Sequence, residues 1–236
     1  MKPVLLLIPG MLNTAAIWGR VTPLIGDAAD VRIASVVTQS TIPEMADDAW
    51  KRVADVKPGT PLVICGFSMG GYTAIEMLTH NNERARDVTA LALLDTSGRP
   101  ESPEGRVIRE KTIAAIEKNF PKVVDFVLAL GTAPAAQGNA ALMQATREIM
   151  LAVGAEANIR QNRAIMARAD NREKLATLRV KTLVMCGRDD KITPPELSTE
   201  LAELIPGAQF EWIDNAGHMT PMEQPERVAA LLKTLL

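Results

Sequence analysis

The chain contains few aromatic residues, few cysteines and no strongly charged region. Aromatic side chains make up 3% of its 236 residues, so aliphatic side chains and the 11 methionines must fill most of any core. The formal net charge is −2 and basic residues form no long run, which argues against a nucleic-acid partner. No apolar stretch approaches the ~20 residues that a membrane-spanning helix needs, so we expect no membrane partner.

The two cysteines, Cys65 and Cys186, each end an apolar run that is typical of a buried strand. If one strand lies between theirs, the two thiols are about 10 Å apart, beyond the reach of a disulfide. The apolar run Val4–Ile8 is too short for the core of a signal peptide, and no suitable cleavage site follows it. We therefore expect two reduced cysteines and a cytoplasmic protein.

Short apolar runs alternate with helical patterns in residues 1–97 and again in residues 179–236. Strands that are apolar throughout are typical of a parallel sheet with helices on both faces. The two ranges therefore predict one doubly wound α/β core of about six strands. The expected strands are Val4–Ile8, Val31–Val36, a run from Leu62, Thr89–Leu94, Thr182–Cys186 and Gln209–Ile213.

Several helices of this core have recognisable ends in the sequence. Thr41 with Glu44 and Thr193 with Glu196 have the spacing of capping boxes, in which both side chains satisfy free N–H groups at a helix start. The expected core helices are Ala15–Ile25, one from Thr41 to about Val56, one ending near Asn81 and Asn82, one from Thr193 to about Leu204, and one from Pro225 to the end.

Residues 98–178 interrupt the alternation, because they show only helical periodicity. One face of each expected helix is apolar and must pack against something. We therefore predict a helical cap inserted over the carboxyl edge of the sheet. Its four helices are Val107–Lys118, Val123–Leu130, Ala140–Val153 and Ala155–Arg168.

The clearest chemical motif is Gly66-Phe67-Ser68-Met69-Gly70, which joins the apolar run from Leu62 to a helical pattern. A serine at the apex of such a turn takes a strained backbone conformation, and its neighbours two positions away must be small. The hydroxyl of Ser68 would then stand clear of the sheet beside the positive end of a helix. This pattern predicts that Ser68 is a nucleophile.

A serine nucleophile needs a base, and the sequence offers two histidines. His80 lies at the expected end of a helix, where it would be solvated. His218 follows the last expected strand, so it would share the carboxyl edge of the sheet with the serine. Three aspartates, Asp95, Asp189 and Asp190, also follow strands at this edge. Each of them could orient the base, cap a helix or pair with a nearby cation.

Nearly the whole chain resembles the α/β-hydrolase superfamily. The resemblance rests on the sharp turn at Ser68, on the order serine, aspartate, histidine along the chain, and on the loops around these residues. The resemblance implies a Gly-x-x-Asp-x-x-x-Pro motif, matched from Gly187 to Pro194, and selects Asp190 over Asp189 as the acid. Asp95 stays an alternative because some members place the acid one strand earlier. The length of the chain suggests that the first two strands of the family's sheet are missing, which would leave a sheet of six strands.

The resemblance also implies an oxyanion hole. The family places one backbone donor after a His-Gly pair, where this chain has Pro9-Gly10-Met11, and the other after the nucleophile. The N–H groups of Met11 and Met69 would therefore hold the oxyanion, and the exchange of histidine for proline affects loop shape rather than the donors. Trp18 is expected to be a packing residue.

We therefore expect a serine hydrolase that cleaves a carboxylic ester, with Ser68, His218 and Asp190 as its triad. No cofactor is needed, and the aspartates lack the ligands that a metal would want. The substrate is expected to be a small, apolar acyl compound, and the sequence assigns no oligomeric state. Carbon–carbon bond hydrolysis, lactone opening, cofactor-free haloperoxidation or a low-turnover receptor are alternatives on the same scaffold. The apolar pocket is suggested by Phe120, Phe126, Met143, Met150 and Met166.

Overall fold

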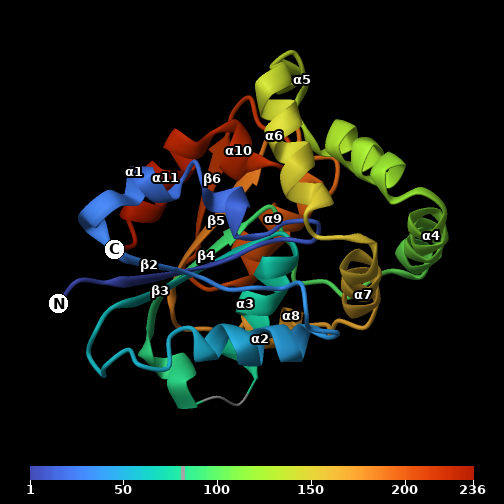
Figure 1. Cartoon of the computed structure of the whole chain (residues 1–236). Helices are drawn as coiled ribbons and strands as arrows, with labels where there is room; N and C mark the ends of the chain where they lie inside the picture. Colours follow the sequence, from blue (N-terminus) through green and yellow to red (C-terminus); the bar gives the residue numbers. More distant parts are fainter. Residues whose placement is uncertain (81–82) are drawn as a thin grey trace.

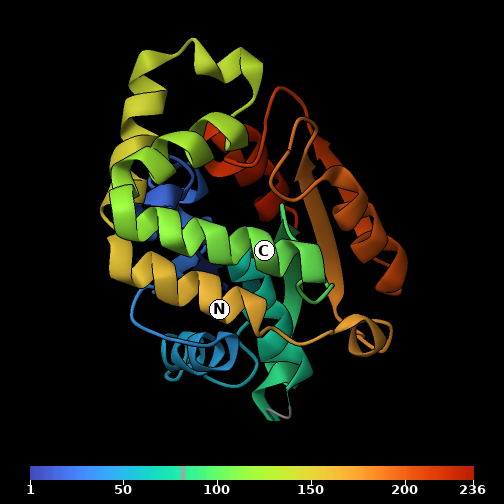
Figure 2. The ribbon, with the colours of Figure 1, turned by 90° about the vertical axis from the view of Figure 1, so that its right-hand side faces the viewer.

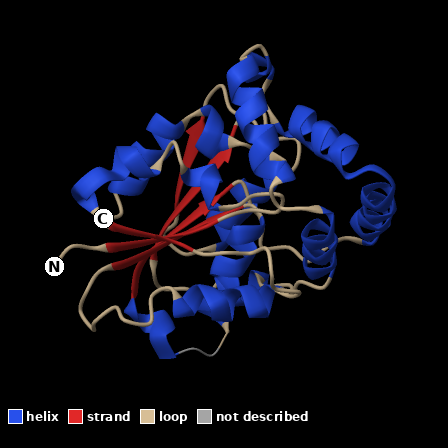
Figure 3. Ribbon diagram, in the orientation of Figure 1, coloured by secondary structure: helices blue, strands red, loops and turns tan. Residues whose placement is uncertain are grey.

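Six parallel strands form one sheet at the centre of the chain. The computed structural model describes residues 1–80 and 83–236, and its strands follow the order β2-β1-β3-β4-β5-β6. All five pairings between neighbours are parallel, which confirms the predicted fold class (Figures 1 and 3). The strands are β1 (Val4–Ile8), β2 (Asp30–Ile33), β3 (Leu62–Phe67), β4 (Val88–Leu94), β5 (Lys181–Gly187) and β6 (Gln209–Ile213).

Helices cover both faces of the sheet because alternate strand residues point to opposite sides. Leu5 and Leu7 of β1 belong to one buried cluster, together with Trp18, whereas Leu6 and Ile8 belong to the other. Figure 1 shows α1 and α11 on one side and α2 and α3 on the other. The helices of the core are α1 (Thr22–Ile25), α2 (Ile42–Lys51), α3 (Met69–Thr79), α9 (Pro195–Leu204), α10 (Thr220–Glu223) and α11 (Pro225–Lys233), with 3-10 turns at Ala15–Trp18, Gly26–Ala28 and Glu83–Asp87.

The segment between β4 and β5 is helical and lies beyond the carboxyl ends of the strands (Figures 1 and 3). Figure 2 shows α4 running beside α7, and the two helices pack on each other. This arrangement agrees with the predicted cap, whose boundaries at residues 98 and 178 stay a prediction. The helices of this insertion are α4 (Pro103–Gly131), α5 (Pro134–Gln137), α6 (Ala140–Leu151), α7 (Ala155–Met166) and α8 (Arg172–Leu175).

Helix α4 joins two helices that were expected separately, Val107–Lys118 and Val123–Leu130. The joint is a kink at Asn119, whose φ of −161° and ψ of 83° are not helical. The side-chain oxygen of Asn119 accepts a hydrogen bond from the backbone N–H of Lys122, as an N-cap does, and Pro121 follows within the first turn. Two helical arms therefore meet at Asn119.

Other boundaries differ from those expected. The predicted helix Ala15–Ile25 is wrong, because the chain forms a 3-10 turn at Ala15–Trp18 and only a short helix from Thr22. Helix α2 ends at Lys51 rather than near Val56, and the expected end of the third helix at Asn81 and Asn82 lies outside the described residues.

Only one of the two expected capping boxes has formed a cap. The Thr41 hydroxyl accepts from the N–H of Glu44, and the Glu44 carboxylate accepts from the N–H of Ser40. The box at Thr193 is wrong, since α9 begins after Pro194 with no side-chain cap. The Thr193 hydroxyl instead binds the carboxylate of Asp190, which removes it from the helix end.

The two cysteines are free and buried, with β4 lying between their strands as expected. Trp18 is fully buried and meets the ring of Phe67 edge-on at 6.2 Å, which confirms it as a packing residue. Within the part of the chain that the structure describes, no helix combines the length and the apolar character needed to cross a membrane.

Candidate active site

Ser68 stands at the sharp turn between β3 and α3. Its φ of 53° and ψ of −118° are strained for a residue with a side chain, and its N–H is held by the Leu94 carbonyl at 2.9 Å. A Cβ atom on Gly66 would overlap the Gly70 carbonyl, and one on Gly70 would overlap the Ile8 carbonyl. Both glycines are therefore required for the turn, as the motif predicted.

Three side chains from different loops form one hydrogen-bonded chain. The Nε2 atom of His218 lies 2.9 Å from the Ser68 hydroxyl, and its Nδ1 atom lies 2.8 Å from Oδ2 of Asp190. The exposed fractions are only 9% for Ser68, 4% for His218 and 3% for Asp190. The structure thus brings together the serine, histidine and aspartate that the sequence selected, with the imidazole between the other two.

Asp190 is surrounded by hydrogen-bond donors. Its Oδ1 atom accepts from the N–H groups of Ile192 at 2.8 Å and Thr193 at 3.0 Å, and Oδ2 accepts from the Thr193 hydroxyl at 2.6 Å. Burial alone would raise the pKa of Asp190, but the charge of His218 and the hydrogen bonds outweigh it and lower the pKa. The carboxylate is therefore ionised and can stabilise a protonated imidazole.

The two other candidate acids occupy different environments. Asp189 is exposed, and its N–H donates to the Ala216 carbonyl at 2.9 Å. Asp95 is fully buried, and its carboxyl group accepts from the N–H of Gly187 at 2.8 Å and from the Thr220 hydroxyl. Neither carboxyl group forms a hydrogen bond with an imidazole among the described residues. Burial, followed by the negative charge of the neighbouring Asp190, raises the pKa of Asp95 well above its usual value.

Asp95, Asp190 and the Cys186 thiol lie close enough together to offer ligand atoms within 4.8 Å of one another. The sequence predicts no such set of metal ligands around Asp190. A thiol must lose its proton to bind a metal, and burial raises the pKa of Cys186, so the thiol stays protonated. The carboxylates already accept hydrogen bonds from Gly187 and Thr193. This cluster therefore fits a metal ion poorly.

The loop after β1 approaches Ser68 closely. A Cβ atom on Gly10 would lie 3.0 Å from the Ser68 Cβ, so the glycine permits this approach. Leu12 has a φ of 59°, and its N–H is held at 3.1 Å by the side-chain oxygen of Gln161 from α7. We call residues 9–13 the oxyanion loop, because Met11, whose N–H is the oxyanion donor expected from the sequence, lies within it. Met69, directly after the serine, begins α3.

The His218 loop is tied to the insertion by hydrogen bonds that the sequence did not predict. The Gly131 carbonyl at the end of α4 accepts from the N–H of His218 at 2.7 Å. The Glu223 carboxylate accepts from Gly217 and Met219, on either side of the histidine, and from Ala133 at 2.8 Å. Glu223 is remote in sequence from Ala133, so no local pattern could have revealed this contact.

His80, the other histidine, lies at the end of α3 as expected. Its side chain is 71% exposed, and its Nδ1 atom lies 3.0 Å from a carboxylate oxygen of Glu76. This surface position separates it from the buried His218.

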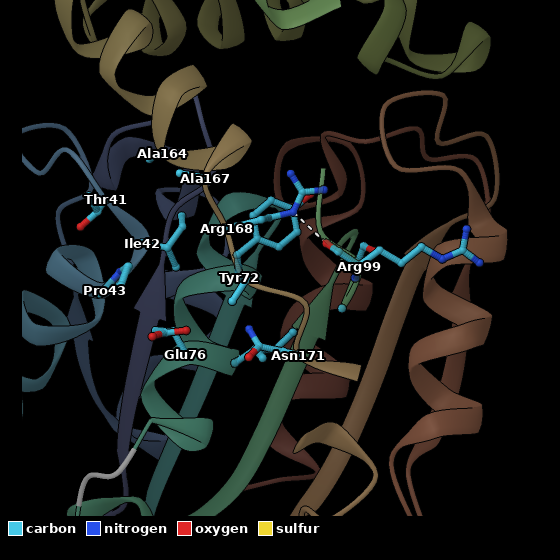
Figure 4. A pocket seen from close by; sticks show the side chains of 14 residues that line it. Thr41, Ile42, Pro43, Tyr72, Glu76, Arg99, Ala164, Ala167, Arg168 and Asn171 are labelled. Atoms are coloured by element: carbon cyan, nitrogen blue, oxygen red, sulfur yellow. Dashed lines mark hydrogen bonds between the residues drawn. The ribbon is translucent and has the colours of Figure 1, made fainter. Parts of the chain in front are cut away.

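The residues proposed for an apolar pocket lie in different surroundings. Met150 is completely buried in a core cluster against which Phe120 and Met143 pack, whereas Phe126 is 67% exposed and lines an open hollow of about 670 Å³ along α4. A smaller cavity of about 230 Å³ lies beside α3, with Tyr72 and Glu76 in its wall (Figure 4). Its lining residues are Thr41, Ile42, Pro43, Tyr72, Ile75, Glu76, Ser97, Gly98, Arg99, Ala164, Ala167, Arg168, Ala169 and Asn171.

Comparisons with known proteins give the family model that the chain matches and the relatives to which it is similar. Residues 5–231 match the model of the alpha/beta hydrolase family. The 3-oxoadipate enol-lactonase 1 of Acinetobacter baylyi is 27% identical over 199 residues, covering 81% of this chain and 70% of the relative. A pimeloyl-[acyl-carrier protein] methyl ester esterase of Aromatoleum aromaticum is 23% identical over 252 residues, which cover 100% of this chain and 98% of the relative. The structure of a thermophilic esterase from Thermogutta terrifontis has a TM-score of 0.86 and 28% identity, covering 99% of this chain and 89% of that chain.

Proposed function

The chain belongs to the alpha/beta hydrolase family, and from this premise we propose that it is a serine hydrolase that cleaves carboxylic esters. The observation that carries the proposal is the hydrogen-bonded chain from Ser68 through His218 to Asp190. Two relatives support the choice of bond, since the names of both describe the hydrolysis of an ester or a lactone.

In the first half of the reaction, the Ser68 oxygen attacks the ester carbonyl carbon while Nε2 of His218 takes its proton. Asp190 holds the imidazole in the required tautomer and stabilises its charged form. The N–H groups of Met11 and Met69 donate to the oxyanion that develops. The carbon–oxygen bond to the alcohol then breaks, His218 protonates the leaving alcohol, and an acyl-enzyme remains.

In the second half, water replaces the alcohol. His218 removes a proton from the water as it attacks the acyl carbon, and then returns the proton to Ser68 as the acid departs. A lactone is an internal ester and would react by the same steps, with one product instead of two. The resemblance to an enol-lactonase supports including lactones in the substrate class.

A fluorophosphonate probe together with a panel of p-nitrophenyl esters tests this function. The wild type should be labelled once, at Ser68, and should hydrolyse short esters continuously. Ser68→Ala should lose both the labelling and the turnover. Ser97→Ala, a change at another buried serine that follows a strand, is the matched control and should keep both. Labelling that persists in Ser68→Ala, or tight ester binding without turnover in the wild type, would contradict the proposal.

A further inference from the structure

The face of α7 that meets the oxyanion loop is polar. Asn158, Gln161 and Asn162 are 1%, 0% and 1% exposed. Gln161 is fully used, because its oxygen accepts from Leu12 and its nitrogen donates to the Val36 carbonyl at 3.0 Å. Buried amides are costly unless they are paired, so their position beside a candidate active site calls for an explanation.

Asn158 is the amide without a partner. Neither its side-chain oxygen nor its nitrogen has a hydrogen bond among the described residues, although both atoms are buried. Gln161 and Asn162 follow three and four residues later, so all three share one face of the helix. Gln161 on this face holds the N–H of Leu12 in the oxyanion loop. Asn158 therefore has a free donor and a free acceptor one helical turn before Asn162.

Helix α4, which packs on α7, carries the positively charged Arg109. The Glu101 carboxylate pairs with both Arg109 and Arg168, so these three groups carry one uncompensated positive charge. Arg168 is otherwise occupied: it donates to the Arg99 carbonyl and stacks over Tyr72 at 4.5 Å, as Figure 4 shows. The three side chains together therefore carry a net positive charge, and Arg109 is the member that contacts Met11 of the oxyanion loop.

Arg109 directs this charge toward the oxyanion loop. Its Nη1 atom lies 3.1 Å from Oδ1 of Asn162 and 3.9 Å from the sulfur of Met11. Its Nη2 atom has no hydrogen-bond partner within the described ranges 1–80 and 83–236. A guanidinium with a free edge and an adjacent amide donor are suited to a planar carboxylate.

We propose that the substrate carries a carboxylate in addition to the bond that is cleaved, and that Arg109 and Asn158 bind it. This inference rests on the proposed ester hydrolysis and names its substrate class. Because Arg109 touches Met11, the carboxylate lies only a few bonds from the reacting carbonyl. A short monoester of a dicarboxylic acid has this layout. An acyl ester of a hydroxy acid places the same charge on the alcohol side.

Chain-matched esters separate these possibilities. Monomethyl esters of succinic, glutaric and adipic acids are compared with the methyl esters of butanoic, pentanoic and hexanoic acids, and 3-acetoxypropionate is compared with propyl acetate. The wild type should favour one charged series by at least about tenfold in kcat/KM, and the favoured series identifies the side that carries the carboxylate. Equal or lower kcat/KM for both charged series would overturn the proposal.

Variants test the two residues. Arg109→Met should lower kcat/KM for the favoured charged esters at least about tenfold and change the uncharged esters less than about threefold. Arg106→Met, at an exposed arginine of the same helix, should change neither. An equal loss in both ester series for Arg109→Met would show that the arginine supports only the fold, and would refute its role in binding.

Asn158→Leu gives a readout that a structural role would not produce. Replacing an unpaired buried amide by an apolar side chain should leave the melting temperature unchanged or raise it. The variant should nevertheless lose part of the preference for charged esters, seen as a higher KM with little change in kcat. An unchanged preference would exclude Asn158 from the site. If uncharged esters react in the wild type but not in Ser68→Ala, the proposed function stands whichever result this inference receives.

Discussion

Asp190 differs from the other acidic residues near His218 in the number of donors that surround its carboxylate. Two backbone N–H groups, the Thr193 hydroxyl and the imidazole all point at it. Asp189, one residue earlier, faces solvent, because successive side chains in an extended loop point in different directions. A difference of one position thus separates a carboxylate that can orient the base from one that cannot.

Exchanging Asp190 for asparagine should therefore nearly abolish activity. Asparagine keeps the shape but favours the wrong tautomer of His218, and in a serine protease the same exchange costs about ten-thousand-fold in kcat. We expect a loss of that order for Asp190→Asn in the hydrolysis of a p-nitrophenyl ester. Asp189→Asn, the matched control, should stay within a few fold. If Asp190→Asn kept a near-normal rate and Asp95→Asn were inactive, the acid of the triad would be Asp95, which follows β4.

At the level of elements, the insertion and the histidine loop behave as one hydrogen-bonded unit. Glu223 on α10 receives N–H groups from both sides of His218 and one from Ala133, and the Gly131 carbonyl holds the His218 N–H. The position of the imidazole therefore depends on where α4 ends. Burial raises the pKa of Glu223, although the three backbone donors and the charge of His218 oppose this effect.

Glu223→Gln tests whether this unit positions the base. One amide oxygen cannot replace a carboxylate that accepts three N–H groups, and the new NH₂ group would face donors. We expect a fall of about 1.5–3 kcal/mol in the free energy of unfolding, the range for a hydrogen bond to a charged group. Displacement of His218 should lower kcat up to about a hundredfold with little change in KM.

Glu226→Gln, at an exposed position on α11, is the control and should leave both quantities near their wild-type values. Urea unfolding and ester kinetics on the same samples provide the measurements. A variant that loses stability but keeps its kcat would show that Glu223 holds the fold without positioning the histidine.

Elements whose signal is local could be predicted from the sequence, whereas those fixed by distant partners could not. Strands β1, β3, β4 and β5 are mostly apolar runs, and α6 and α7 begin where their helical periodicity begins. Strand β2 contains Asp30 and Arg32 and ends at Ile33 rather than at the predicted Val36. Thr193 has the spacing of a helix cap, yet its hydroxyl lies 3.2 Å from the ring of His218, which is 25 residues away. Gln161 and Glu223 accept hydrogen bonds from Leu12 and Ala133, each more than 80 residues away in the sequence. No spacing in the sequence predicts these two contacts.

For the whole molecule, the topology of the sheet explains why the site could be located before its contacts were known. Parallel neighbours place their carboxyl ends at one edge, so the loops after β3, β4, β5 and β6 bring Ser68, Asp95, Asp190 and His218 together. The same topology has a cost, because it places two carboxyl groups, Asp95 and Asp190, side by side in the interior. Their mutual repulsion should appear in the stability of the entire domain.

The stability of the protein should therefore fall as the pH rises above the ordinary range of an aspartate, and Asp95 should be responsible. Its pKa is raised in the folded state by burial and then by the charge of Asp190, with a smaller contribution from Glu223. In the unfolded chain, Asp95 ionises near pH 3.9, a value typical of free aspartates. The stability that protonated Asp95 contributes is therefore fully present below about pH 3.9. It is lost progressively as the pH rises from that value to the raised pKa of Asp95 in the folded state.

Asp95→Asn removes this titration while keeping the shape of the side chain. We expect a higher melting temperature than the wild type at pH 8 and a smaller gain at pH 5. A one-unit rise in pKa is worth about 1.4 kcal/mol, and 1 kcal/mol corresponds to about 2–4 °C in a domain of this size. Asp189→Asn, at an exposed carboxylate, should shift neither melting temperature by more than about 1–2 °C, because surface substitutions rarely exceed about 0.5 kcal/mol. An equal gain in melting temperature at both pH values would contradict this prediction, because it would mean that Asp95 is ionised at both. The hydrogen bonds from the Gly187 N–H and the Thr220 hydroxyl would then offset the repulsion from Asp190.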